Sequence, residues 1–177
     1  LAEPPPSAVP RGALAAVAAW AGALDERDQA RLLRPLVPSV IAVAHAAVAL
    51  ADDETLLVAT SLLDDLVRAS ALSVSHTVPV CELALTATNA AGLEAGSHSA
   101  ALMLVASLIA TRRKLLVKQQ MLAPVFARLV DVCGGDEEEG AGADDADEAA
   151  PVRHACEVLE LLAEEVSSRH MMPLVLE

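Results

Sequence analysis

Aromatic residues are almost absent from this chain, which contains one phenylalanine, one tryptophan and no tyrosine. Hydrophobic residues nevertheless make up 54% of its 177 residues. Alanine and leucine supply much of this content and dilute the β-branched residues. Because these two residues are among the best helix formers, the composition predicts an all-α chain.

Cysteine is scarce as well. Cys81, Cys133 and Cys156 lie far apart in the sequence, and their spacing fits neither a metal-binding pair nor an obvious disulfide framework. We therefore expect a reduced, intracellular compartment in which each thiol acts as a small core hydrophobe.

The chain also lacks the usual motifs of catalysis and cofactor binding. Its five histidines have no partner one helical turn away, so a zinc site has little support. The segment Gly140-Ala141-Gly142 matches neither a phosphate loop nor a dinucleotide fingerprint. The adjacent pairs Ser75-His76 and Ser97-His98 do not form a nucleophile and its base, because neighbours on a helix do not face each other. We expect no enzymatic activity, no metal and no cofactor.

Long hydrophobic runs are missing. The longest uncharged stretches are 35–51 and 95–111, and both are rich in alanine. A membrane-spanning helix needs about 20 predominantly apolar residues, more hydrophobic than alanine, so both stretches fall short. Residues 1–11 contain three consecutive prolines and an acid before the first basic residue, unlike a signal peptide. The sequence predicts no membrane insertion.

Basic residues are few: 12 Lys and Arg face 25 Asp and Glu, which gives a net charge of −13 and a pI near 4.6. Such an acidic chain is a poor partner for nucleic acid. One candidate basic turn stands out where the fifth and sixth expected helices meet, formed by Arg112, Arg113, Lys114 and Lys118. It either binds a partner or stabilises the C-terminus of the fifth helix, where cations are favoured.

Acidic residues are concentrated in the segment 134–150, which contains eight acids and no base. Like charges repel and glycine is flexible, so we expect a disordered loop between two repeats. This segment is either a simple spacer or an electrostatic attractor for basic proteins. In the second case the candidate cargo-binding residues are Asp136, Glu137, Glu138, Glu139, Asp144, Asp145, Asp147 and Glu148.

An apolar-Pro-apolar pattern recurs along the chain. Its prolines are Pro38, Pro79, Pro124 and Pro173, and the last and longest interval between them contains the acidic segment. A period of about 40–47 residues with two helices per unit is typical of HEAT and armadillo repeats. The pattern predicts an α-α superhelix, a solenoid of antiparallel helix pairs of about 40–45 residues, with the proline in the second helix of each pair.

The expected helices cover 8–24, 29–50, 75–90, 97–112, 115–133 and 152–166, with another beginning at the acids 52–54 and the start of an eighth near residue 172. A polar turn is expected at 25–28, Ser75 is the expected N-cap of the fourth helix, and Pro124 is expected to kink the sixth or to follow an irregular first turn. These helices group into repeats at 8–51, 52–92, 96–133 and 151–177. Because the chain begins without methionine and ends just inside a helix, we expect it to be a slice of a longer array.

Two of these helices show a clear amphipathic period. In the helix that begins at 52–54, the expected apolar face is Leu56, Ala59, Leu63, Leu66 and Val67, opposite Glu54, Ser61, Asp65 and Arg68. In the helix 152–166, the expected apolar stripe is Val152, Ala155, Cys156, Leu159, Leu162, Ala163 and Val166, opposite Arg153, Glu157, Glu160 and Glu164. The helix 97–112 is apolar around most of its circumference and is expected to pack between neighbours.

Three stretches, taken in order, resemble the importin-β (karyopherin-β) superfamily and in particular its importin 4 type. The first is 61–70, Ser-Leu-Leu-Asp-Asp-Leu-Val-Arg-Ala-Ser. The second is 98–129, an apolar helix followed by a basic turn and a leucine-rich helix with Pro124. The third is the acidic tract leading into 155–163 and then 172–177. The resemblance covers 31–177, and its specificity lies in the succession of these parts.

This resemblance implies a nuclear transport receptor whose inner face, lined by second helices, wraps basic cargo such as histones, ribosomal proteins or nuclear localisation signals. Ran-GTP would release the cargo, Phe-Gly nucleoporins would bind between outer helices, and the protein would shuttle between cytoplasm and nucleus. By the same analogy the acids of 136–139 and 144–148 would face cargo or Ran. A structural scaffold, such as a HEAT-repeat phosphatase regulatory subunit, requires the same stacking but no acidic tract.

Overall fold

The computed structural model describes residues 8–134 and 150–176. Over these two ranges the regular structure is entirely helical, as the composition predicts. The helices are α1 (Ala8–Gly22), α2 (Glu26–Leu33), the short 3-10 helix η1 (Arg34–Leu36), α3 (Val37–Leu50), α4 (Asp53–Arg68), α5 (Val74–Ala87), α6 (Ala95–Lys118), α7 (Leu122–Gly134), α8 (Ala150–Glu165) and α9 (Ser168–Leu176).

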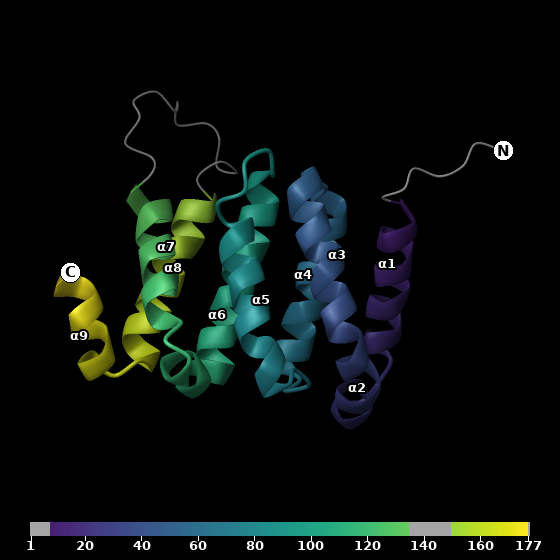
Figure 1. Ribbon diagram of the computed structural model, residues 1–177, viewed down its shortest axis with the longest axis horizontal. Helices are drawn as coiled ribbons and strands as arrows, with labels where there is room; N and C mark the ends of the chain where they lie inside the picture. Colours follow the sequence, from purple (N-terminus) through teal and green to yellow (C-terminus); the bar gives the residue numbers. More distant parts are fainter. Residues whose placement is uncertain (1–7, 135–149, 177) are drawn as a thin grey trace.

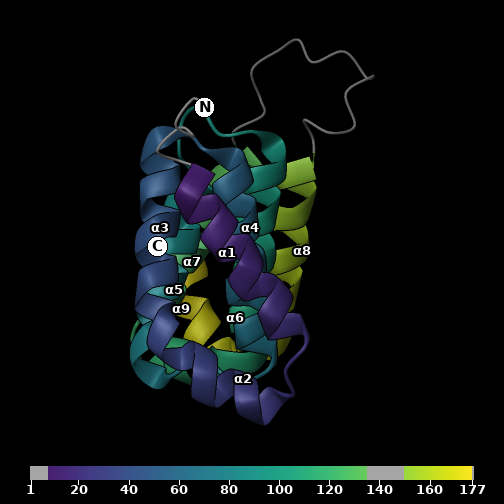
Figure 2. The ribbon, with the colours of Figure 1, turned by 90° about the vertical axis from the view of Figure 1, so that its right-hand side faces the viewer.

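The helices follow one another along the long axis of the molecule, from α1 at one end to α9 at the other (Figure 1). Viewed along that axis, they form two layers (Figure 2). In the first layer α4 contacts α1 and α6, and α6 also contacts α8, whereas in the second layer α3 contacts α5. The layers are joined by contacts of α3 with α4, α5 with α6, and α7 with α8. Each of these three pairs joins a second-layer helix to the first-layer helix that follows it in sequence.

Helix α6 occupies the centre of this arrangement. It packs against α4 and α8 in its own layer and against α5 in the other. Its buried apolar side chains cover a broad side of the helix and include Ala101, Leu102, Leu104, Val105, Leu108 and Ile109, whereas Met103 and Ala110 on the opposite side are exposed. Burial of this much apolar surface is the main force that holds the layers together.

Helix α4 forms as the sequence predicts. Asp52 is its N-cap: one carboxylate oxygen accepts a hydrogen bond from the Thr55 amide at 3.1 Å, and the other accepts one from the Thr55 hydroxyl at 2.8 Å. The predicted apolar face is buried and consists of Leu56, Ala59, Leu63, Leu66 and Val67. The predicted polar face, which includes Asp65 and Arg68, is exposed. The amphipathic period therefore predicted the buried and the exposed face of α4 correctly.

The second expected helix, 29–50, is wrong as a single element. It divides into α2, η1 and α3 around Pro35 and Pro38. Proline has no N–H to donate, so two consecutive turns cannot maintain regular α-helical bonding. The expected polar turn at 25–28 is wrong too, because Asp25 caps α2 by accepting a hydrogen bond from the Asp28 amide at 2.8 Å.

The expected break between the fifth and sixth helices is present as a kink at Arg112, but a second break after Lys118 divides the expected sixth helix. Helix α6 continues to Lys118 across non-helical backbone angles at Arg112, and the chain then turns at Gln120, whose φ is 58°. Helix α7 begins only at Leu122, so Pro124 lies in its first turn and does not kink it. The missing N–H of a proline is tolerated there because the first turn has no intrahelical partner for it.

Two smaller corrections concern helix starts and faces. Helix α5 begins at Val74 with Ser73, and not Ser75, at the N-cap position. In α8 the buried side chains are Ala155, Val158 and Leu162. The expected stripe included Cys156 and Ala163, but both are exposed because the buried face is rotated toward Val158.

By length and composition, one described stretch, Arg27–Leu50, is apolar enough to cross a membrane. In the structure this stretch is interrupted by η1, and α3 buries one side in the core through Val37, Val40, Ile41, Ala44 and Ala47. A helix that packs in the core of a folded domain passes the same test of length and hydropathy, so a single such stretch is weak evidence for a membrane span. The absence of membrane insertion stays a prediction.

Candidate functional site

The eight acids of the candidate cargo-binding segment, from Asp136 to Glu148, lie outside the described residues. The structure describes what flanks them: α7 ends at Gly134, α8 begins at Ala150, and the two helices pack against each other. The end of α7 and the start of α8 both lie on the same side of the molecule, at the top of the view in Figure 1. The segment therefore connects two adjacent helices.

Helix α8 continues the acidic character of this region along its exposed face. Glu157, Glu160 and Glu164 are spaced at helical intervals, so they line one side of the helix, and all three are exposed. Arg153 lies on the same side one turn earlier. Within the described ranges, no ion pair involves these three glutamates. The face is thus available for a basic partner.

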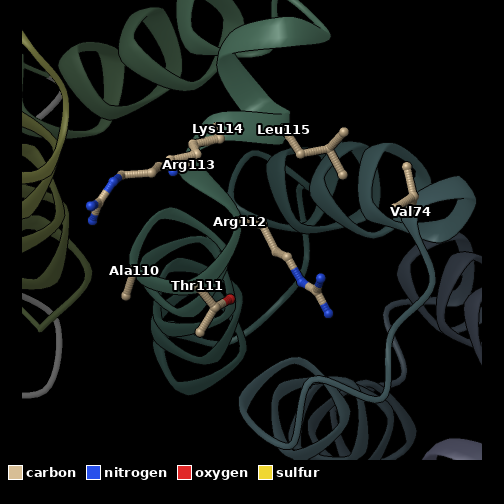
Figure 3. A pocket seen from close by; sticks show the side chains of 7 residues that line it. All are labelled: Val74, Ala110, Thr111, Arg112, Arg113, Lys114 and Leu115. Atoms are coloured by element: carbon tan, nitrogen blue, oxygen red, sulfur yellow. The ribbon is translucent and has the colours of Figure 1, made fainter.

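The candidate basic turn is not a single cluster. Arg112 and Arg113 point to opposite sides of the backbone (Figure 3). Arg112 is half-buried, and its Nη2 donates a hydrogen bond of 3.0 Å to the carbonyl oxygen of Leu72, in the turn between α4 and α5. Arg34 approaches the same turn from η1, because its Nε donates to the carbonyl oxygen of Ala71 at 3.3 Å. The role of Arg112 is therefore to hold that turn.

Arg113 forms an ion pair with Glu165 at the end of α8, whereas Lys114 and Lys118 are exposed. The α8–α9 turn places Arg169 and His170 beside Arg113 and Lys114, and these residues line an open hollow of about 410 Å³. A second hollow, of about 420 Å³, is lined by Val74 and by residues 110–115 (Figure 3). Sequence reasoning missed Arg169 because it is far from Lys114 along the chain and only the packing of α6 against α8 brings the two together.

We predict that Arg112→Ala lowers the free energy of unfolding by about 1.5–3 kcal/mol, the usual contribution of a hydrogen bond made by a charged group. The reason is that the Leu72 carbonyl loses its charged donor. Lys114→Ala, at an exposed position close by, is the matched control and should change stability by less than about 0.5 kcal/mol. Urea denaturation followed by circular dichroism measures both values, and equal losses would contradict the anchoring role of Arg112.

Three of the described histidines make local hydrogen bonds through their Nδ1 atoms. The Nδ1 atoms of His76 and His170 lie 3.0 and 3.1 Å from the hydroxyls of Ser73 and Ser167, each at the start of its helix. The Nδ1 of His98 lies 2.9 Å from the Ala87 carbonyl oxygen. This agrees with the expectation that such residues occupy helix starts. In 8–134 and 150–176, no group of three or more His, Cys, Asp or Glu side chains is positioned to hold a metal ion.

The structure brings together two residues that the sequence analysis treated as unrelated. The Sγ atoms of Cys133, near the end of α7, and Cys156, on α8, lie 3.4 Å apart. Their spacing along the chain gave no indication of a pair, because it contains the whole acidic segment. The one usable signal was that both cysteines flank this segment at the ends of helices expected to be neighbours.

Comparison of the chain with protein-family models, with curated proteins and with solved structures gave no match.

Proposed function

We propose that this chain is part of a HEAT/armadillo-type solenoid that binds basic proteins. The repeats would be 8–51, 52–92, 96–133 and 151–177. The closest packing between consecutive helices, of α3 with α4, α5 with α6 and α7 with α8, then joins each proposed repeat to the next. The two-layer arrangement supports this proposal, since α4, α6 and α8 succeed one another in one layer. The recurrent prolines support it too, because Pro38, Pro79, Pro124 and Pro173 lie in α3, α5, α7 and α9, the second helix of each proposed pair.

The observation that carries the binding proposal is the concentration of acids at one place. Eight acids lie in 134–150, and three more are exposed along the helix that follows. A surface of one sign attracts partners of the other sign and raises their rate of encounter. The partner chemistry that fits is a lysine- and arginine-rich protein such as a histone, a ribosomal protein or a nuclear localisation signal.

The location of charge favours one part of the molecule for this contact. The second-layer helices α3, α5 and α7 contain only Glu82, Arg128 and Asp131 as charged residues, and the last two lie 3.4 Å apart as an ion pair. We therefore place the basic partner at the acidic segment and on α8, and not along the second-layer surface that the family resemblance implies.

Within this proposal, the whole protein is an importin-β-like nuclear transport receptor that shuttles between cytoplasm and nucleus. Ran-GTP and Phe-Gly nucleoporins are its further partners, and these contacts belong to the full receptor. The second candidate function is a HEAT-repeat scaffold or adaptor, such as a phosphatase regulatory subunit. The two-layer stack suits that candidate equally, whereas a scaffold gives no reason for eight acids in so short a segment.

Deletion of 136–148 combined with a change of salt tests the proposal. Immobilised purified core histones should retain the intact chain at about 50 mM salt and release most of it at about 500 mM, because screening weakens exposed charge pairs. The deletion variant should bind weakly under both conditions. Retention that is unchanged by both the deletion and the salt would contradict the electrostatic role and would leave the scaffold as the better explanation.

A further inference from the structure

The Cys133 and Cys156 thiols form a pair that the proposed binding function does not use. Cys133 is the penultimate residue of α7, and Cys156 lies on α8, which packs against it. Their Sγ atoms are 3.4 Å apart. A disulfide bond requires about 2.05 Å, so the sulfurs need to approach by about 1.4 Å.

The surroundings of Cys133 permit this movement. Gly134, the last residue of α7, is exposed, and among residues 8–134 and 150–176 no atom would lie within 4 Å of a Cβ built on it. No described residue therefore packs against the end of the helix at that point. Because a terminal helical turn is held by fewer hydrogen bonds than the interior, a small shift there has a low cost.

The two thiols differ in accessibility. Cys156 is exposed and Cys133 is half-buried, so a dissolved oxidant reaches the Cys156 sulfur first. Burial, with a smaller contribution from the neighbouring Cys156 thiol, raises the pKa of Cys133 to about 11. Cys133 is therefore protonated at neutral pH and is a poor nucleophile for the first attack on an oxidant.

We propose that Cys133 and Cys156 are a redox-sensitive pair that forms an intramolecular disulfide when the protein meets a two-electron oxidant such as hydrogen peroxide. The Cys156 thiolate attacks one peroxide oxygen, the O–O bond breaks, and a sulfenic acid and hydroxide form. The Cys133 sulfur then attacks the Cys156 sulfur, the S–O bond breaks, and the leaving hydroxyl departs as water with the Cys133 proton. In total two thiols and one hydrogen peroxide give one disulfide and two waters.

The bridge would tie the end of α7 to α8. A covalent link between Cys133 and Cys156 closes a loop around the acidic segment, and such a link restricts the unfolded chain more than the folded one. The oxidised protein should therefore have a thermal midpoint about 5–10 °C above that of the reduced protein. Reduction with dithiothreitol should restore the original midpoint.

Cys81 provides an internal control. It is fully buried in α5, and burial raises the pKa of its thiol to about 12. Native Cys81 should therefore resist both peroxide and iodoacetamide, and should be alkylated only after denaturation. The Cys81→Ser variant should still form the bridge.

The test is peptide mapping of the whole chain after hydrogen peroxide treatment at low protein concentration, with alkylation in denaturant and no reductant. The expected product has lost two hydrogens, contains a linked Cys133–Cys156 peptide and carries one alkyl group, on Cys81. Cys156→Ser and Cys133→Ser should each abolish the linked peptide. Absence of that peptide from the oxidised wild-type chain, or links only between molecules, would overturn the proposal, and this wild-type result does not depend on how the variants fold.

Discussion

Leu108→Ala is expected to lower the free energy of unfolding by about 2–5 kcal/mol, the range for a leucine truncated in a packed core. Leu108 is 0% exposed and lies on α6, which packs against α4, α5 and α8. Because α6 is held between several helices, a shift of one of them is not expected to fill the cavity. The stack should therefore be more sensitive here than at its edges.

Met103→Ala on the same helix is the control for Leu108→Ala. Met103 is 41% exposed, so its truncation removes little buried surface and should change stability by less than about 0.5 kcal/mol. Urea unfolding of the two variants, followed by circular dichroism, gives the comparison. If both lose the same stability, α6 is not the centre of the core.

Replacing Glu157, Glu160 and Glu164 together with glutamine should weaken binding of core histones by about threefold to a hundredfold at low salt. Each exposed charge pair contributes about 0.2–1 kcal/mol, and about 1.4 kcal/mol corresponds to a factor of ten in affinity. Glutamine retains the size and helix propensity of glutamate, so the helix itself should be preserved. Fluorescence anisotropy with labelled histones measures the change.

A second triple variant tests whether the loss of histone affinity comes from the α8 face or from the change in net charge alone. Asp65→Asn, Glu82→Gln and Glu94→Gln change the charge by the same amount at three exposed positions on other elements. This control should lose much less affinity than the α8 variant. Equal losses from the two variants would contradict a defined contact on α8 and would attribute the effect to general charge.

The sequence was sufficient to predict the helical class and the faces of α4, because an apolar stripe at helical spacing has only one way to be buried. The charged side of α8 was predicted equally well: Arg153, Glu157, Glu160 and Glu164 are all exposed. The buried side was less certain, because alanine and cysteine are small enough to occupy either the core or its edge. This ambiguity is why Val158, and not Cys156, proved to be buried.

Helix ends depended on effects that the apolar pattern does not encode. The turn after Lys118 contains Gln119 and Gln120, without a glycine or proline to mark it, and Gln120 takes a positive φ. The change of direction at Arg112 coincides with its tertiary hydrogen bond to the Leu72 carbonyl, which lies on a distant part of the chain. Sequence alone placed a turn near Arg112, but it could not separate the kink there from the true end of α6 at Lys118.

The candidate sites were predicted as continuous stretches of the sequence. In the structure, some neighbours in these stretches point apart, and some residues distant in the sequence come together. The basic turn divides because Arg112 and Arg113 bind groups on opposite sides of the chain, the Leu72 carbonyl and Glu165. The cysteine pair appears only when α7 packs on α8. Both results depend on contacts between helices, which the spacing of residues within one helix does not determine.

The measurement that tests the central claim most directly is the dissociation constant for core histones as a function of salt, for the intact chain and for a variant with Asn or Gln at all eight acids of 136–148. A second variant that keeps these eight acids in scrambled order is the control, since long-range attraction depends on charge and not on order. We predict that the neutral variant binds at least about tenfold more weakly at low salt, with a shallower salt dependence, while the scrambled variant behaves like the intact chain. Equal affinity and equal salt dependence for all three chains would contradict the proposed binding of basic proteins.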